Sequence, residues 1–60
     1  MRIVRNAARC RRCRTVIESR HRHDFVVCSC QAIFVDGGRD YLRSGGNPDD
    51  FELLAIMEEG

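Results

Sequence analysis

The apolar residues of this chain fall into short runs separated by polar loops. One run, 15–19, is followed by the polar letters RHRH and then by a second run at 25–27. β-Branched and aromatic residues in runs of this length favour β-strands, and a polar stretch between two such runs favours a turn. We therefore expect a hairpin over residues 15–28, in a register that places Ile17 opposite Val26.

A second hairpin is predicted around the stretch VDGGRDYLR, which spans residues 35–43. Two adjacent glycines accept positive φ at both central positions of a two-residue turn. A turn at Gly37 and Gly38 sets a register in which Phe34 faces Tyr41, and opposed residues share one face of a sheet.

Arginines flank this aromatic pair on the face away from the expected core. With Arg39 and Arg43 beside them, Phe34 and Tyr41 could stack on a nucleic acid strand. They could also form a contact for a protein, since Arg and Tyr are frequent in binding hot spots. As a third alternative, the acidic C-terminal segment covers this face.

The last part of the chain, residues 47–58, has the pattern of a short helix. Asn47 suits the N-cap, Pro48 suits the first helical position, and Asp49 and Asp50 suit the positive end of the helix dipole. Apolar residues follow three and four positions apart. We expect a helix here, with a strand as the alternative.

The chain has four cysteines among only 60 residues, and these bear on how so small a domain is stabilised. A core of this size supplies about 3–5 kcal/mol, so small domains add disulfides, a metal or a partner. Fourteen residues separate the pair Cys10 and Cys13 from the pair Cys28 and Cys30. Two close pairs of this kind are typical of a zinc ribbon, in which four thiolates surround one Zn²⁺.

All four positions of such a site are closed by protein ligands, so the zinc is expected to be structural. Two disulfides would need an oxidising compartment, and a redox dithiol would need a βαβ context. Zinc knuckles usually place Gly after the second cysteine, where this chain has Arg14 and Gln31. The spacing does not distinguish zinc from iron.

Together these patterns predict one small, metal-stabilised, mainly β domain over residues 1–60. It consists of a lead-in at 1–8, a zinc ribbon of two β-hairpins at 10–44 and a C-terminal helix at 47–58.

The net charge of +1 hides an uneven distribution of charge. Eight of the ten arginines lie in the first 22 residues, and eight of the nine acids follow His23. The basic half could contact a polyanion, or it could meet the acidic half within the chain or in a dimer. The candidate contact residues are Arg11, Arg12, Arg14, Arg22, Phe34, Arg39, Tyr41 and Arg43.

His21, His23 and Asp24 could bind a second metal or take part in acid–base chemistry. The simpler interpretation is a polar hairpin loop. An enzyme would need these groups to converge with Asp36 and Asp40 in a cleft, for which 60 residues leave little room. We predict no catalytic residue.

The chain shows no apolar leader and no run near the roughly 18 apolar residues of a membrane span. We therefore expect an intracellular, cytoplasmic protein without a membrane partner.

The motifs resemble those of small zinc-ribbon proteins encoded by bacteriophages, prophages and bacteria, a family of unknown function. The resemblance covers about residues 10–47 and lies in CxxC from Cys10, IESxHRHDF over 17–25, CxC from Cys28 and VDGGxDYLR over 35–43. It implies a zinc-binding ribbon in the host-cell cytoplasm and gives no activity.

Two functions follow as hypotheses. The first is a non-catalytic binding module, an accessory or inhibitor protein that contacts a host protein machine. The alternative is a nucleic-acid-binding ribbon that uses the arginine-rich first cysteine turn together with Phe34, Tyr41 and Arg43.

Overall fold

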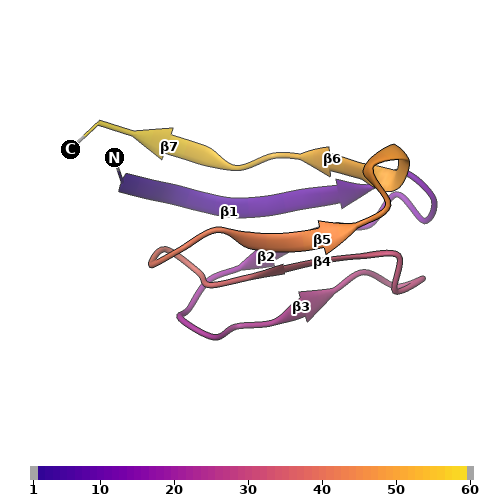
Figure 1. The fold of residues 1–60 in the computed structure, drawn as a ribbon, viewed down its shortest axis with the longest axis horizontal. Coiled ribbons are helices and arrows are strands. Elements are labelled where there is room, and N and C mark those ends of the chain that lie inside the picture. Colours follow the sequence, from indigo (N-terminus) through magenta and orange to yellow (C-terminus); the bar gives the residue numbers. More distant parts are fainter. Residues whose placement is uncertain (1, 60) are drawn as a thin grey trace.

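The computed structural model describes residues 2–59, which form short β-strands and one 3₁₀ turn (Figure 1). The elements are β1 (Arg2–Cys10), β2 (Val16–Ser19), β3 (Val26–Val27), β4 (Ile33–Asp36), β5 (Arg43–Gly46), η1 (Pro48–Asp50), β6 (Phe51–Leu53) and β7 (Ile56–Glu58). They build two antiparallel sheets. In one sheet β1 pairs with β2, β6 and β7, and the other has the order β3-β4-β5. The predicted mainly β class is confirmed.

Strand β2 pairs with β1 and not with β3, so the predicted hairpin over 15–28 is wrong. Ile17 lies opposite Ala8, and β3 pairs instead with β4. The cause is the first cysteine turn, where the N–H of Cys10 donates to the carbonyl of Thr15 at 3.0 Å and turns β1 directly back into β2. Most of the lead-in expected at residues 1–8 therefore belongs to β1, the longest strand described.

The hairpin of β4 and β5 also differs from its predicted register. Phe34 lies opposite Gly45, four residues beyond the expected Tyr41. The carbonyl of Gly37 accepts the N–H groups of Asp40 at 3.0 Å and of Tyr41 at 3.3 Å, which closes a turn wider than two residues. Tyr41 therefore lies in the loop and not beside Phe34.

The two glycines nevertheless have the backbone conformation that the turn prediction required. Gly37 has φ of 101° and Gly38 has φ of 56°. The observed register differs from the expected one by an even number of residues, and side chains alternate between the two faces of a strand. Val35 accordingly stays in the core, and Phe34 stays on the outer face.

The predicted helix over 47–58 is wrong, because only η1 forms and the chain then continues as β6 and β7. The Asn47 cap is present, since its Oδ1 accepts the N–H of Asp49 at 3.0 Å. At Phe51 the backbone becomes extended and pairs with Cys10 of β1. An open strand edge gives this segment a complete ladder, whereas an isolated helix this short is marginal.

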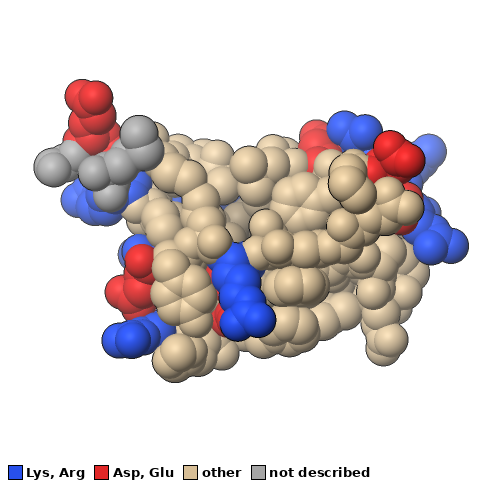
Figure 2. All heavy atoms as spheres, in the orientation of Figure 1, with Lys and Arg blue, Asp and Glu red and all other residues tan. Residues whose placement is uncertain are grey.

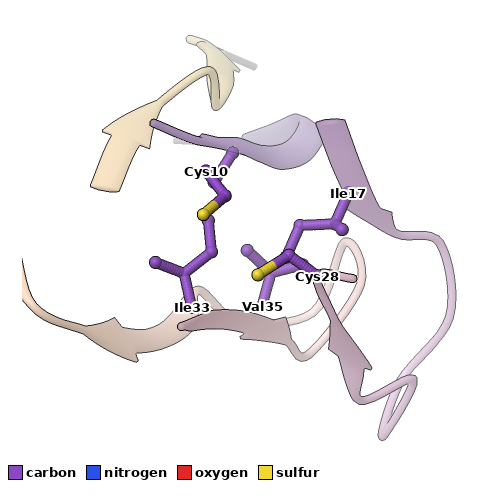
Figure 3. Packing of buried hydrophobic residues seen from close by; sticks show 6 residues of the cluster. Cys10, Ile17, Cys28, Ile33 and Val35 are labelled. Carbon is purple, nitrogen blue, oxygen red and sulfur yellow. The ribbon is translucent and has the colours of Figure 1, made fainter. Parts of the chain in front are cut away.

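The core lies between the two sheets (Figure 3). Cys10 and Ile17 project from β1 and β2 toward Ile33 and Val35 of β4, and Cys28 closes the same space. Two cysteines are thus part of a very small apolar core. Any metal bound by them would join the core directly, and the stability of the fold would depend on it.

The molecule is elongated, with extents of 34 × 19 × 14 Å. Both cysteine turns lie at one end of the long axis, and the loops 20–25 and 37–42 lie at the other (Figure 1). Charged side chains gather toward the two ends, and one basic side chain also lies near the middle of the same view (Figure 2).

Candidate metal centre

Each pair of cysteines occupies a turn between two antiparallel strands. Cys10 ends β1 and Cys13 lies in the turn to β2, and Cys28 and Cys30 lie in the turn from β3 to β4. The four Sγ atoms all lie within 4.8 Å of one another. None of the four cysteines forms a disulfide.

The shape of this cluster suits a tetrahedral metal ion. Four Zn–S bonds of about 2.3 Å place the sulfurs of a regular tetrahedron about 3.8 Å apart. Sγ of Cys30 lies 3.5 Å from Sγ of Cys10 and 3.6 Å from Sγ of Cys28. Small adjustments of the turns would therefore seat an ion among the four sulfurs.

Both turns reverse the chain through a residue in the left-handed region. Arg14 has φ of 61° and Gln31 has φ of 64°. These are the two positions where Gly is usual in a zinc knuckle. The turns thus form without glycine, at a cost of about 1–2 kcal/mol for each residue. In the second turn the N–H of Gln31 donates to the carbonyl of Cys28 at 2.9 Å, which helps to hold this conformation.

The first turn favours a thiolate at Cys13. Hydrogen bonds from the side chain and the backbone of Thr15, and one from the backbone of Cys30, lower the pKa of the Cys13 thiol to about 5. A thiolate is the form of cysteine that binds metal. Thr15 is therefore a functional neighbour of the site, although the sequence pattern indicated only that it belongs to the strand run 15–19.

In the second turn the pKa values of the two thiols are shifted in opposite directions. Burial acts to raise the pKa of Cys28, but hydrogen bonds from the backbone of Ile33 and from the other thiols lower it overall. The backbone of Ala32 acts to lower the pKa of Cys30, yet burial and the neighbouring thiols raise it to about 11. The metal-free cluster thus keeps protons among its sulfurs, and a bound cation would displace them.

The site connects the core to the surface. Cys10 is fully buried and Cys28 is 3% exposed, while Cys13 is half-buried and Cys30 is exposed. The four sulfurs fill all the positions of a tetrahedral ion. An ion held by all four sulfurs would have no open coordination position.

A family model described as a domain of unknown function, DUF7695, matches residues 2–46. The chain belongs to this family. No curated protein and no solved structure matches the chain. The DUF7695 match includes both cysteine turns and β1 to β5, and it ends before η1, β6 and β7.

The loop between β2 and β3, which carries both histidines of the DUF7695 domain, lies at the end of the molecule away from the two cysteine turns (Figure 1). Nδ1 of His23 is 3.0 Å from the Tyr41 hydroxyl, and the two rings meet edge to face. Within residues 2–59 the cysteine cluster is the one group of three or more metal-ligating side chains that lie close enough to share an ion.

A buried polar network, which no sequence pattern indicated, holds this histidine end together. The amide nitrogen of Asn6 donates to the carbonyls of Asp36 at 2.8 Å and of Gly38 at 3.1 Å. The hydroxyl of Ser19 donates to the carbonyl of Asp24 and accepts the N–H of Gly38 at 2.8 Å. Hydrogen bonds of Asn6 and Ser19 thus connect the VDGG stretch to β1 and β2, and Ser19 also connects it to the loop 20–25.

Several N-terminal arginines pair with acids of the same chain. Arg2 lies 2.9 Å from Glu58, and Arg9 lies 3.6 Å from Glu52. The acidic tail therefore compensates part of the basic strand β1. In residues 2–59, six arginines form no ion pair within 4 Å. They are Arg11, Arg12, Arg14, Arg22, Arg39 and Arg43.

The expected aromatic pair of Phe34 and Tyr41 does not form. Phe34 stacks on Phe25 instead, with ring centroids 4.9 Å apart and an angle of 25° between the planes. Val27 lies opposite Phe34 on the adjacent strand. We call Phe25, Val27 and Phe34 the aromatic face. Phe25 was not expected on this face because β3 was predicted to pair with β2, whereas it pairs with β4.

No helix in residues 2–59 is both long enough and apolar enough to cross a membrane.

Proposed function

We propose that the four cysteines hold one structural Zn²⁺ and that the chain is a zinc ribbon. The observation that carries this proposal is the closeness of four Sγ atoms, two from each turn, within 4.8 Å. Four sulfurs in a tetrahedron suit zinc or an iron centre. Elemental analysis of the purified protein tests the choice, since a colourless protein with one zinc supports zinc and a red protein with iron contradicts it.

The bound metal would decide whether the chain folds. Structural zinc contributes about 10–16 kcal/mol in small domains of this kind. That exceeds the about 3–5 kcal/mol expected from a core of this size. Because Cys10 and Cys28 belong to the core, loss of the ion would leave charged or protonated thiols inside it.

The function we propose is non-catalytic binding of a protein through the aromatic face. Phe25 is 57% exposed and Val27 is 39% exposed. Stacked aromatic side chains with no charge among them suit an apolar protein surface better than a polyanion. The resemblance to phage and prophage proteins points to a host protein in the cytoplasm, and to a role as an accessory or inhibitor protein.

A capture experiment with matched variants tests this function. The zinc-loaded domain is immobilised and exposed to host lysate beside Phe25→Ser and Leu53→Ser. Leu53 is 58% exposed but lies on β6 in the other sheet, so it serves as the control. We expect one host protein to be captured by the wild type and by Leu53→Ser and to be lost with Phe25→Ser. Equal capture by all three proteins would contradict the proposal.

Nucleic-acid binding is the second candidate. It is supported by Arg11, Arg12 and Arg14, which are exposed at the metal end without an ion pair in residues 2–59. Binding through them should weaken steeply as salt is added, because phosphate contacts release counterions. Labelled oligonucleotides at low and physiological salt test this. Binding that Arg11→Ala and Arg12→Ala reduce, and Arg2→Ala does not, would favour this candidate over the first.

A further inference from the structure

Strand β5 forms an open edge of its sheet. It pairs only with β4, and no further backbone hydrogen bond joins residues 43–46 to another part of the described chain. Natural edges are usually protected by charged residues, proline or a bulge. Here the sequence of the edge is Arg-Ser-Gly-Gly, and only its first residue carries a charge.

The hydrogen-bond pattern shows which groups face outward. The carbonyl of Ile33 accepts the N–H of Cys28, so the backbone N–H and C=O groups of Ile33 point toward β3. Residues along a strand point alternately to the two neighbours. The backbone N–H and C=O groups of Phe34 therefore point toward β5, where Gly45 is the partner residue. By the same alternation, the N–H and C=O groups of Ser44 and Gly46 point out of the sheet and are exposed.

An open groove of about 350 Å³ runs beside this edge. It is lined by Ser44, Gly45, Gly46, Pro48 and Phe51, so its wall is small and apolar. Phe51 packs against the core and is only half-covered. If a further strand paired with β5, one of its side chains could lie in this groove and cover Phe51.

The edge also has opposite charges at its two ends. Arg43 lies at its start, and Asp49 lies just beyond its end in η1. Both side chains are exposed, and neither has an ion pair within 4 Å in residues 2–59. A strand that runs antiparallel to β5 with the same pair of charges would be complementary to it.

We propose that β5 pairs antiparallel with β5 of a second copy of this chain about a two-fold axis. A register with Ser44 opposite Gly46 of the second copy lets both exposed pairs of backbone groups bond across the axis. Each Arg43 then lies beside the Asn47–Asp50 turn of the other copy. The two small sheets join into one, and the aromatic faces lie on the same side of it.

The same register supplies an apolar contact. It brings Leu42 of the second copy opposite Pro48 and onto the inner side of the sheet, over the groove that Phe51 lines. Leu42 is 36% exposed in the single chain. In this register the second copy thus offers three complementary contacts. They are backbone hydrogen bonds, opposite charges and one apolar side chain over the groove.

The association is expected to be weak. A standard interface buries about 800 Å² on each partner, whereas the whole chain exposes 4177 Å². A four-residue edge and one side chain bury less than that standard area. The dimer should therefore form at high protein concentration and should dissociate on dilution.

Sedimentation equilibrium of the zinc-loaded protein, from about 10 μM to about 1 mM, suits an interface of this strength. We expect a monomer–dimer equilibrium that Arg43→Glu and Asp49→Arg each weaken by about tenfold, because each creates two like-charge contacts. An equimolar mixture of the two variants should associate as strongly as the wild type, since the new acid of one then meets the new base of the other. Arg12→Glu at the metal end is the control and should change nothing.

A wild type that stays monomeric at the highest concentration would overturn the inference, and so would a mixture that associates no better than either variant. Neither result affects the metal proposal or the aromatic face. A variant that fails to bind one zinc is replaced by Leu42→Ser, which should weaken association in the same direction.

Discussion

The hydroxyl groups of Thr15 and Ser29 lie 3.0 Å apart and hydrogen-bond across the two cysteine turns. The hydroxyl of Thr15 also lies 3.2 Å from Sγ of Cys13. One side chain therefore connects the first turn both to the second turn and to a ligand sulfur. When Cys13 is a thiolate, the hydroxyl donates to the sulfur, and bonds to charged acceptors are the stronger kind.

Thr15→Val should weaken metal binding by about tenfold to a hundredfold, because it removes a hydrogen bond to a charged sulfur worth about 1.5–3 kcal/mol together with the link between turns. Ser29→Ala removes only that link and should weaken binding a few-fold. Competition for zinc against a coloured chelator measures both. Equal affinities for the two variants would show that the bond to Cys13 contributes nothing.

The left-handed residues of the turns give a stabilising prediction. Arg14→Gly and Gln31→Gly should each raise stability by about 1 kcal/mol, since glycine accepts φ near 60° without strain. For a domain of this size that corresponds to about 4–8 °C in melting temperature. Thermal unfolding of the zinc-loaded variants measures the change. Arg12→Gly in the same turn is the control, because Arg12 has no positive φ to relieve, and an equal rise there would contradict the explanation.

Gly38 should be among the least replaceable residues. A Cβ at this position would lie 2.4 Å from the backbone of His21, and φ of 56° adds strain. Gly38→Ala is expected to cost about 3 kcal/mol, combining a backbone clash with the wrong conformation. Gly45→Ala is the milder control, because its Cβ meets the ring of Phe34, a side chain on an exposed face. Chemical denaturation compares the two, and similar losses would mean that His21 can move aside.

Tyr41 is expected to stabilise the fold. Its hydroxyl bonds to His23, and its ring lies over Gly37, where a Cβ would be 2.4 Å from a ring carbon. Tyr41→Ala should lower the free energy of unfolding by about 2–3 kcal/mol, below the range for a fully buried aromatic residue. Tyr41→Phe loses only an exposed hydrogen bond and should cost about 0.5–1 kcal/mol. If Tyr41→Ala unfolds like the wild type but loses a partner, the residue belongs to a binding surface instead.

Local signals in the sequence predicted the two cysteine turns and the Asn47 cap, but not the turns of the two expected hairpins. The spacing of the cysteines placed Cys10, Cys13, Cys28 and Cys30 in two facing turns, and the structure brings their sulfurs together. The Asn47 cap is also present. Each of these features depends on a few neighbouring residues, so their chemistry is visible in the sequence alone.

The partners of the strands were not visible in the same way. Cys10 pairs with Phe51, far along the chain, and no pattern near either residue specifies the other. The tail was expected to be a helix because its cap and apolar spacing are helical, yet the open edge of β1 gives it a ladder. Pairing over long distances overrides local preference when an edge needs a partner.

The fold is expected to depend most directly on the metal. Native mass spectrometry of the freshly purified protein, before and after chelator, tests it together with the circular dichroism of the same samples. We expect one zinc on each chain, free thiols at all four cysteines, and loss of β-structure when the zinc is removed. A folded protein that carries no metal, or one whose mass shows two disulfides, would contradict the account.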